Sequence, residues 1–103
     1  MIDMRKLRRE FLRWMLLITL NNARASGGAS EDLLLQVVNS EYSDATPLEL
    51  RGEMDYLEAR DLIAIKRHPD GRWVADISRY GIDIVEYTVE CDPGIARPKR
   101  TGL

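Results

Sequence analysis

The stretch TPLELRGEMDYLEARDLIAIKRHPDGRWVADI occupies residues 46–77 and decides the fold. Thr46 followed by Pro47 is a typical helix start, because threonine caps free backbone N–H groups and proline fits the first helical position. Glu49 stands three residues after Thr46, which is the spacing of a capping box. A helix is therefore predicted to begin at Pro47 and to end near Arg60.

The second half of this stretch predicts a β-hairpin. Residues 62–65 are short, apolar and partly β-branched, as is typical of a strand. The Pro69-Asp70-Gly71 segment favours a tight turn, since proline presets φ and glycine accepts a positive φ. Residues 73–77 then alternate in polarity as a second strand does.

Residues 3–24 predict a long first helix with two apolar rows. One row contains Met4, Leu7, Phe11, Trp14 or Met15, and Ile18, and the other contains Leu12, Leu16 and Leu20. A helix that is apolar on more than one side is usually covered by other elements or by a second subunit. We therefore expect a homodimer whose interface includes Phe11, Leu12, Met15, Leu16 and Leu20.

The remaining segments complete a mostly helical α+β chain. Residues 25–29 are predicted to form a flexible break, and Ser30 is predicted to cap a second helix. A short C-terminal helix is expected to begin at Ser78 or Arg79. We expect one domain over residues 1–90, followed by an extended, partly flexible tail over residues 91–103.

Length and composition favour a single intracellular domain. The chain has 103 residues, of which 45% are hydrophobic and 31% charged. Its longest apolar run, Trp14–Ile18, is far shorter than the roughly 20 residues that cross a bilayer. A lone Cys91 permits no internal disulfide. We expect a cytoplasmic protein without membrane contact.

Charge is unevenly distributed along the chain. The formal net charge is −2, which is unusual for a nucleic-acid-binding protein. Residues 46–61 hold two arginines against five carboxylates. Both ends of the chain and the hairpin turn carry an excess of basic residues. The middle helices are therefore expected to be acidic.

The segment from Leu57 to Glu86 resembles the winged helix-turn-helix superfamily of bacterial regulators. In that superfamily a third helix ends in an L…GLI pattern, a hairpin forms the wing, and a T..G…V helix follows. The matching positions here are Leu57, Leu62, Ile63, Gly81, Ile82 and Val85. Asp61 replaces the glycine that often lies between helix and strand, although Asp tolerates the left-handed conformation expected there. The ending GIDIVEYTVECDPGIARP also makes the whole chain similar to small proteins of Mu-like phages and prophages.

Catalytic chemistry has little support in the sequence. His68 is the only histidine and lies on the hairpin turn, where no partner for acid–base work is evident. No phosphate-binding loop or zinc-ligand spacing occurs, and the carboxylates are scattered. We expect no enzyme activity, no cofactor, no metal and no small-molecule substrate.

DNA binding and protein–protein interaction are the two functions that the pattern leaves open. The resemblance implies a transcription regulator that contacts double-stranded DNA mainly through a basic wing and basic termini. The candidate DNA-binding residues are Arg5, Arg8, Arg9, Arg51, Lys66, Arg67, Arg72, Arg97, Lys99 and Arg100. The acidic third helix argues against this, because phosphate neutralisation supplies much of DNA affinity. The alternative is an assembly module that binds another protein and no DNA.

Overall fold

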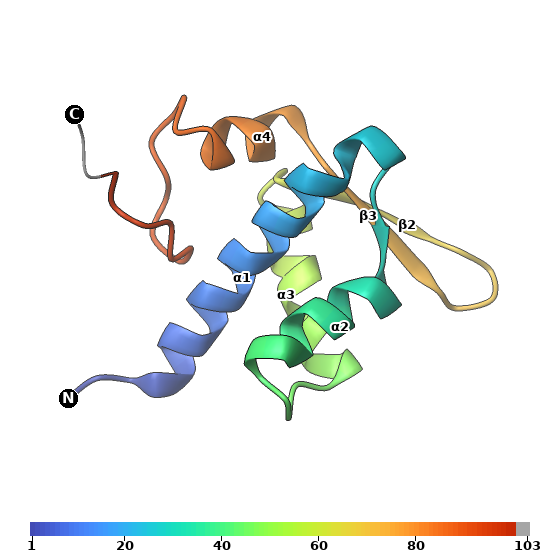
Figure 1. Ribbon diagram of the computed structural model, residues 1–103, viewed down its shortest axis with the longest axis horizontal. Helices are drawn as coiled ribbons and strands as arrows, with labels where there is room; N and C mark the ends of the chain where they lie inside the picture. Colours follow the sequence, from blue (N-terminus) through green and yellow to red (C-terminus); the bar gives the residue numbers. More distant parts are fainter. Residues whose placement is uncertain (101–103) are drawn as a thin grey trace.

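The structure is a computed structural model that describes residues 1–100, and helices predominate in it (Figure 1). The helices are α1 (Met4–Ala23), a short 3-10 helix (Arg24–Ser26), α2 (Glu31–Glu41), α3 (Pro47–Ala59) and α4 (Arg79–Val85). The strands are β1 (Ala29–Ser30), β2 (Ile63–Arg67) and β3 (Trp73–Ile77). The predicted α+β, mostly helical class is confirmed.

The helices begin where capping side chains stand. The hydroxyl of Ser30 accepts a hydrogen bond from the Leu33 N–H, and that of Thr46 accepts from the Glu49 N–H. Ser78 caps α4 in the same way. These predicted starts are confirmed. Only half of the predicted capping box forms, because the Glu49 carboxylate accepts from Arg8 at 2.8 Å.

The predicted hairpin is confirmed, and it belongs to a three-stranded antiparallel sheet of order β1-β3-β2. Ile63 pairs with Ile77 and Arg67 with Trp73 at its two ends. The turn closes where the His68 N–H donates to the Arg72 carbonyl at 2.9 Å. Gly71 takes φ +90° there, as the turn requires.

Strand β1 lies partly in the segment that was predicted to be a flexible break. Ala29 pairs with Ala75 and Ser30 with Val74. Gly28, at φ +108°, packs so closely on the Ala75 carbonyl that no side chain would fit. The prediction was wrong because two residues carry no strand periodicity and are held only by their partner strand.

One apolar row of α1 faces the core of the molecule, and the other faces outward. Leu12, Leu16, Leu17 and Leu20 are 0% exposed and form the centre of the core. The prediction that Leu12, Leu16 and Leu20 lie in a dimer interface was therefore wrong, since the monomer itself buries them. They pack with residues from every other helix, among them Leu34, Val38, Leu50, Met54, Leu57 and Ile84.

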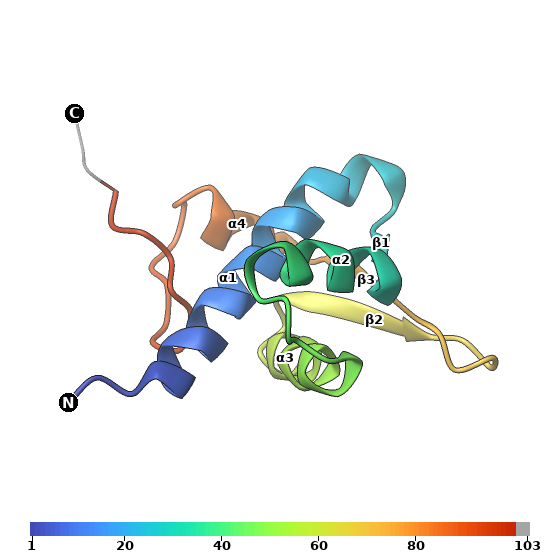
Figure 2. The same cartoon turned by 60° about the horizontal axis from the view of Figure 1, so that its bottom comes forward.

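The hairpin projects from one end of the molecule, and the N-terminus and the described part of the tail lie toward the other (Figures 1 and 2). The segment after α4 runs back along the amino half of α1. There the Ala96 N–H donates to the Glu10 carbonyl at 3.0 Å, and Arg13 donates to the Gly94 carbonyl at 2.9 Å. The described part of the tail, residues 91–100, is thus extended but attached, while residues 101–103 of that prediction lie outside the described residues. Within residues 1–100, no helix combines the length and the apolarity needed to cross a membrane.

Candidate interaction surfaces

Trp73 lies at the junction between α3 and the hairpin, where two predicted DNA-binding residues contact its ring. The guanidinium carbons of Arg51 and Arg67 lie 4.3 Å and 4.4 Å from its ring centroid. Each contact is a cation–π interaction of about 0.5–2 kcal/mol. The two arginines therefore hold the first residue of β3 in place.

Arg51 is held by several contacts within the chain. It donates to both carboxylate oxygens of Glu31 at 2.7 Å and 2.6 Å and to the Gly71 carbonyl at 2.6 Å. Glu31 also accepts the Trp73 N–H at 2.9 Å. The Glu31 side chain is only 11% exposed, and the Arg51 hydrogen bonds lower its pKa. Arg51 thus links α2, α3 and the hairpin turn.

Arg67 is paired with the acidic side of α3. Its guanidinium donates to Asp55 at 2.9 Å and to Glu58 at 2.9 Å. Glu58 also accepts the Ile65 N–H at 3.2 Å, on the outer edge of strand β2. The hydrogen bond from Arg67 lowers the pKa of Glu58. One carboxylate therefore both neutralises a cation and covers an otherwise open strand edge.

Two of the predicted cations at the chain ends are also used internally. Arg8 pairs with Glu49 at 2.8 Å and with Asp44 at 2.9 Å, and both contacts raise its pKa. Arg97 donates to the carbonyls of Ile84 and Val89, each at 3.0 Å, just beyond the end of α4. These arginines connect α1 to α3 and the tail to α4.

The other predicted cations are exposed. Arg72 lies 3.8 Å from Asp70 on the hairpin turn and is more than half exposed. The remaining five form no ion pair with a carboxylate of residues 1–100; they are Arg5, Arg9, Lys66, Lys99 and Arg100.

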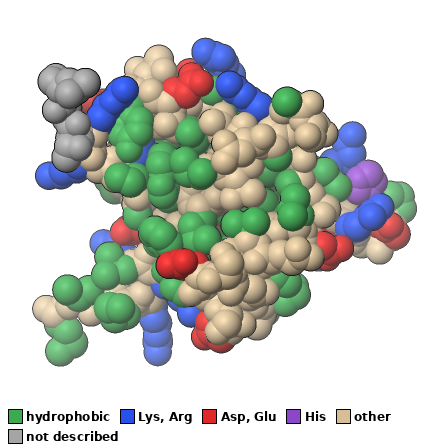
Figure 3. Space-filling view, viewed as in Figure 1, with side chains coloured by type: hydrophobic (Ala, Val, Ile, Leu, Met, Phe, Trp, Pro, Cys, Tyr) green, Lys and Arg blue, Asp and Glu red, His purple; other side chains and the backbone are tan. Residues whose placement is uncertain are grey.

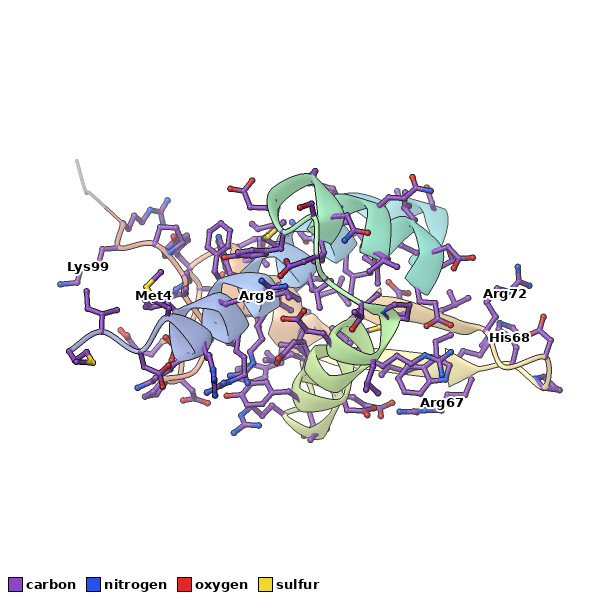
Figure 4. The ribbon with its side chains drawn as sticks, turned by 90° about the horizontal axis from the view of Figure 1, so that it is seen from below. Met4, Arg8, Arg67, His68, Arg72 and Lys99 are labelled. Carbon is purple, nitrogen blue, oxygen red and sulfur yellow. The ribbon has the colours of Figure 1, made fainter. Side chains whose placement is uncertain are left out.

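The basic hairpin and the basic chain ends lie at opposite ends of the molecule. Figure 4 shows Arg67, His68 and Arg72 at one end and Lys99 at the other. The longest dimension of the molecule is 46 Å. The structure thus does not bring the predicted DNA-binding residues together into one surface, and between the two groups lies α3 with its carboxylates.

An apolar surface remains open on α1. Of the predicted dimer residues, Phe11 is 37% exposed and Met15 is half-buried. Both line a shallow groove with Ile18 and with Val37 of α2. The sequence showed this row of side chains, but which of the two rows faced the core was visible only in the structure.

Reactive side chains stand apart from one another. His68 lies on the hairpin turn, and Cys91 lies in the tail, where burial raises the pKa of its thiol. Across the part of the chain that the structure describes, no three His, Cys, Asp or Glu side chains come close enough to hold a metal ion.

The main partners that the sequence analysis missed are Glu31 and Trp73. Glu31 stood in the first turn of a helix, where its charge had a sufficient local role. Arg51 lies 20 residues further along the chain, so no local spacing indicated the pair. The Arg67–Glu58 pair joins residues only nine positions apart, because α3, which carries Glu58, directly precedes β2, which carries Arg67.

Comparison with models of protein families, with curated proteins and with solved structures gives no match.

Proposed function

We propose that this chain is a winged helix-turn-helix domain that acts as a protein–protein interaction module and does not read DNA with α3. The element order supports the winged arrangement: a long helix and a short strand precede a helix pair, and a hairpin follows. The short first strand pairs with the last one, β3, and not with β2. The hairpin, or wing, then projects beside α3 (Figure 2).

The observation that carries the proposal is the neutralisation of Arg51 and Arg67. A bidentate arginine contact with a base is worth about 1–3 kcal/mol. Leaving a largely buried acceptor without its hydrogen-bond donor costs about 1–3 kcal/mol, and more when the acceptor is charged. Glu31 is 11% exposed and would be left in that way if Arg51 turned toward a guanine. The free energy that Arg51 would gain from a base contact is therefore offset by the cost of leaving Glu31 unpaired.

The charge of the surrounding surface supports the same conclusion. Asp55 and Glu58 occupy the side of α3 next to the hairpin and hold Arg67. DNA affinity comes largely from cations that are free to replace counterions along the phosphates. A surface whose arginines are already paired with carboxylates offers few free cations to a phosphate backbone, and this favours a protein partner over DNA.

DNA binding through the chain ends is the second candidate function. It is favoured by the exposed cations Arg5, Arg9, Lys99 and Arg100, which have no carboxylate partner within residues 1–100. Such contacts would be independent of base sequence. A regulatory role in a phage or prophage remains part of the proposal on the sequence resemblance alone.

A titration against random-sequence duplex DNA at low and high salt tests the proposal. The interaction module is expected to show no binding at low salt. Binding that weakens steeply with salt and is lost in the Arg5→Ala/Arg9→Ala variant would support the second candidate. Binding lost in Arg67→Ala, but retained in the matched control Arg24→Ala, would overturn the proposal. Circular dichroism of each variant verifies the fold.

A further inference from the structure

The outward row of α1 is a continuous apolar stripe with no charged member. Met4 is 71% exposed, Leu7 45% and Phe11 37%. Met15 and Ile18 continue the row and line the groove beside α2. Figure 3 shows hydrophobic side chains along the diagonal that α1 follows across this face. Contiguous apolar patches of this kind mark interaction sites more often than single exposed residues do.

The spacing of this stripe is symmetric about Phe11. Leu7 and Met15 lie four residues before and after it, and Met4 and Ile18 lie seven residues before and after it. If a second α1 helix runs in the opposite direction with its Phe11 beside the first Phe11, each apolar side chain of the row therefore lies opposite another apolar side chain. At about 1.5 Å per residue, the stripe extends for roughly 21 Å.

The geometry points to a second copy of this chain as the partner, with the two α1 helices packed antiparallel and Phe11 at the twofold axis. A twofold interface requires a surface that is complementary to itself, and a row with symmetric spacing meets this requirement. Met4 of each copy then faces Ile18 of the other, and Leu7 faces Met15. This inference goes beyond the proposed function and does not depend on it.

Charge selects the antiparallel over the parallel arrangement. Arg8 and Arg13 are paired with carboxylates, but the N-terminal segment of α1 stays basic because Arg5, Lys6 and Arg9 form no ion pair with a carboxylate of residues 1–100. A parallel pair would place these two basic segments side by side, with like-charge repulsion. The Asp3 carboxylate caps the first turn of α1, where it accepts from the Arg5 and Lys6 N–H groups, and each α1 helix carries a dipole along its axis. In an antiparallel pair the two dipoles oppose and compensate each other.

Helix α2 extends the surface on one side of the stripe. Leu33 is 46% exposed, and Val37 lines the same groove as Phe11 and Ile18. Helices packed in this way usually cross at about 20°, with side chains of one in the grooves of the other. A second copy of α1 would then cover the stripe and this edge of α2 together.

Sedimentation over a range of concentrations tests the dimer. The chain is expected to reach twice its monomer mass of 11.8 kDa. Phe11→Glu places two carboxylates at the axis and is expected to weaken dimerisation at least about 30-fold, as the loss of one interface hot spot does. Leu48→Glu is the matched control, because Leu48 is 83% exposed on α3; its dimer should persist.

A monomer at the highest attainable concentration, or a Phe11→Glu variant that still dimerises, would overturn the inference. Because this assay contains no DNA, its failure leaves the proposed function intact. DNA binding in the titration above would equally leave the dimer intact.

Disulfide trapping tests the direction of the helices. In a Cys91→Ser background, Phe11→Cys is expected to crosslink to itself under mild oxidation. A mixture of Met4→Cys and Ile18→Cys chains is expected to give the mixed disulfide, while Met4→Cys alone gives none. Crosslinking of Met4→Cys to itself would indicate parallel helices and would overturn the inference.

Discussion

Helices α1 and α3 differ in which side chains on their outward faces remain available to bind a partner. The outward row of α1 is apolar and only partly covered, by Tyr42 and by Val37 of α2. The outward charges of α3 are plentiful, but Arg51 and Asp55 are already paired, with Glu31 and Arg67 respectively. The comparison teaches that binding capacity depends on which groups remain unpaired after folding, and not on which groups a helix contains.

Two criteria can be used to choose the helix that binds a partner: analogy with other folds, and the surface that remains exposed after folding. By analogy with the proposed winged helix-turn-helix arrangement, α3 would be the reading helix. By its residual chemistry, α1 has more to gain from contact, because covering apolar surface is worth about 25 cal/mol per Å². Fold analogy alone does not determine function, and here the two criteria select different helices.

The largest expected effect separates the two rows of α1. Leu16→Ala removes a side chain that is 0% exposed and is expected to lower the free energy of unfolding by about 2–5 kcal/mol. Met15→Ala changes the neighbouring outward position and is expected to cost less than about 0.5 kcal/mol in the monomer. Urea unfolding at low protein concentration measures both. Equal losses of unfolding free energy in the two variants would contradict the assignment of one row to the core and the other to the outward face.

The second effect concerns the neutralised surface of α3. Glu31→Gln leaves Arg51 without its carboxylate and weakens the acceptor for the Trp73 N–H. A loss of about 1–3 kcal/mol is expected, which is typical of a disrupted buried polar contact. Because Trp73 lies against Arg51, its fluorescence should shift as well. Wild-type stability and an unchanged emission spectrum would contradict the role given to this pair.

Acid pH tests the same pairs without mutation. The folded-state pKa values of Glu31 and Glu58 lie below the usual value of 4.5 because arginines hold the charged forms. Their contribution is therefore complete above about pH 4.5 and is lost as pH falls through the folded-state pKa values. The urea midpoint should fall in that range, and less steeply in Glu31→Gln. Glu90→Gln, at an exposed tail position, is the control and should leave the slope unchanged.

The smallest effect is expected at Gly52, on the exposed side of α3. A Cβ built there meets nothing within 4 Å. Gly52→Ala is therefore expected to stabilise the chain by about 1 kcal/mol, from helix propensity alone, which raises Tm by about 4–8 °C. Gly28→Ala is the matched control and should destabilise, since the Ala75 carbonyl occupies that space. If the Gly52→Ala variant were stabilised but no longer bound a partner, the backbone of that partner would have to pack closely against α3 at Gly52.

Local signals in the sequence were sufficient for most elements. The caps at Ser30, Thr46 and Ser78 mark helix starts through hydrogen bonds that span only three residues. The left-handed turn expected at Asp61 is present, with φ +62°. Such features are predictable because the residues that form them are neighbours in the chain.

The failures share a different physical cause. Strand β1 exists only because β3 pairs with it, from more than 40 residues away. The choice between the two rows of α1 depended on where α2, α3 and α4 pack. The availability of Arg51 depended on Glu31, which no local rule connects to it.

By itself, the sequence determined where α2, α3, α4 and the hairpin begin, and that α1 is apolar on two sides. Only the tertiary structure decided which side the core takes and which cations stay free. The physical reason is range: caps and turns are satisfied within a few residues, whereas burial and ion pairing depend on groups that the chain brings together only after it folds.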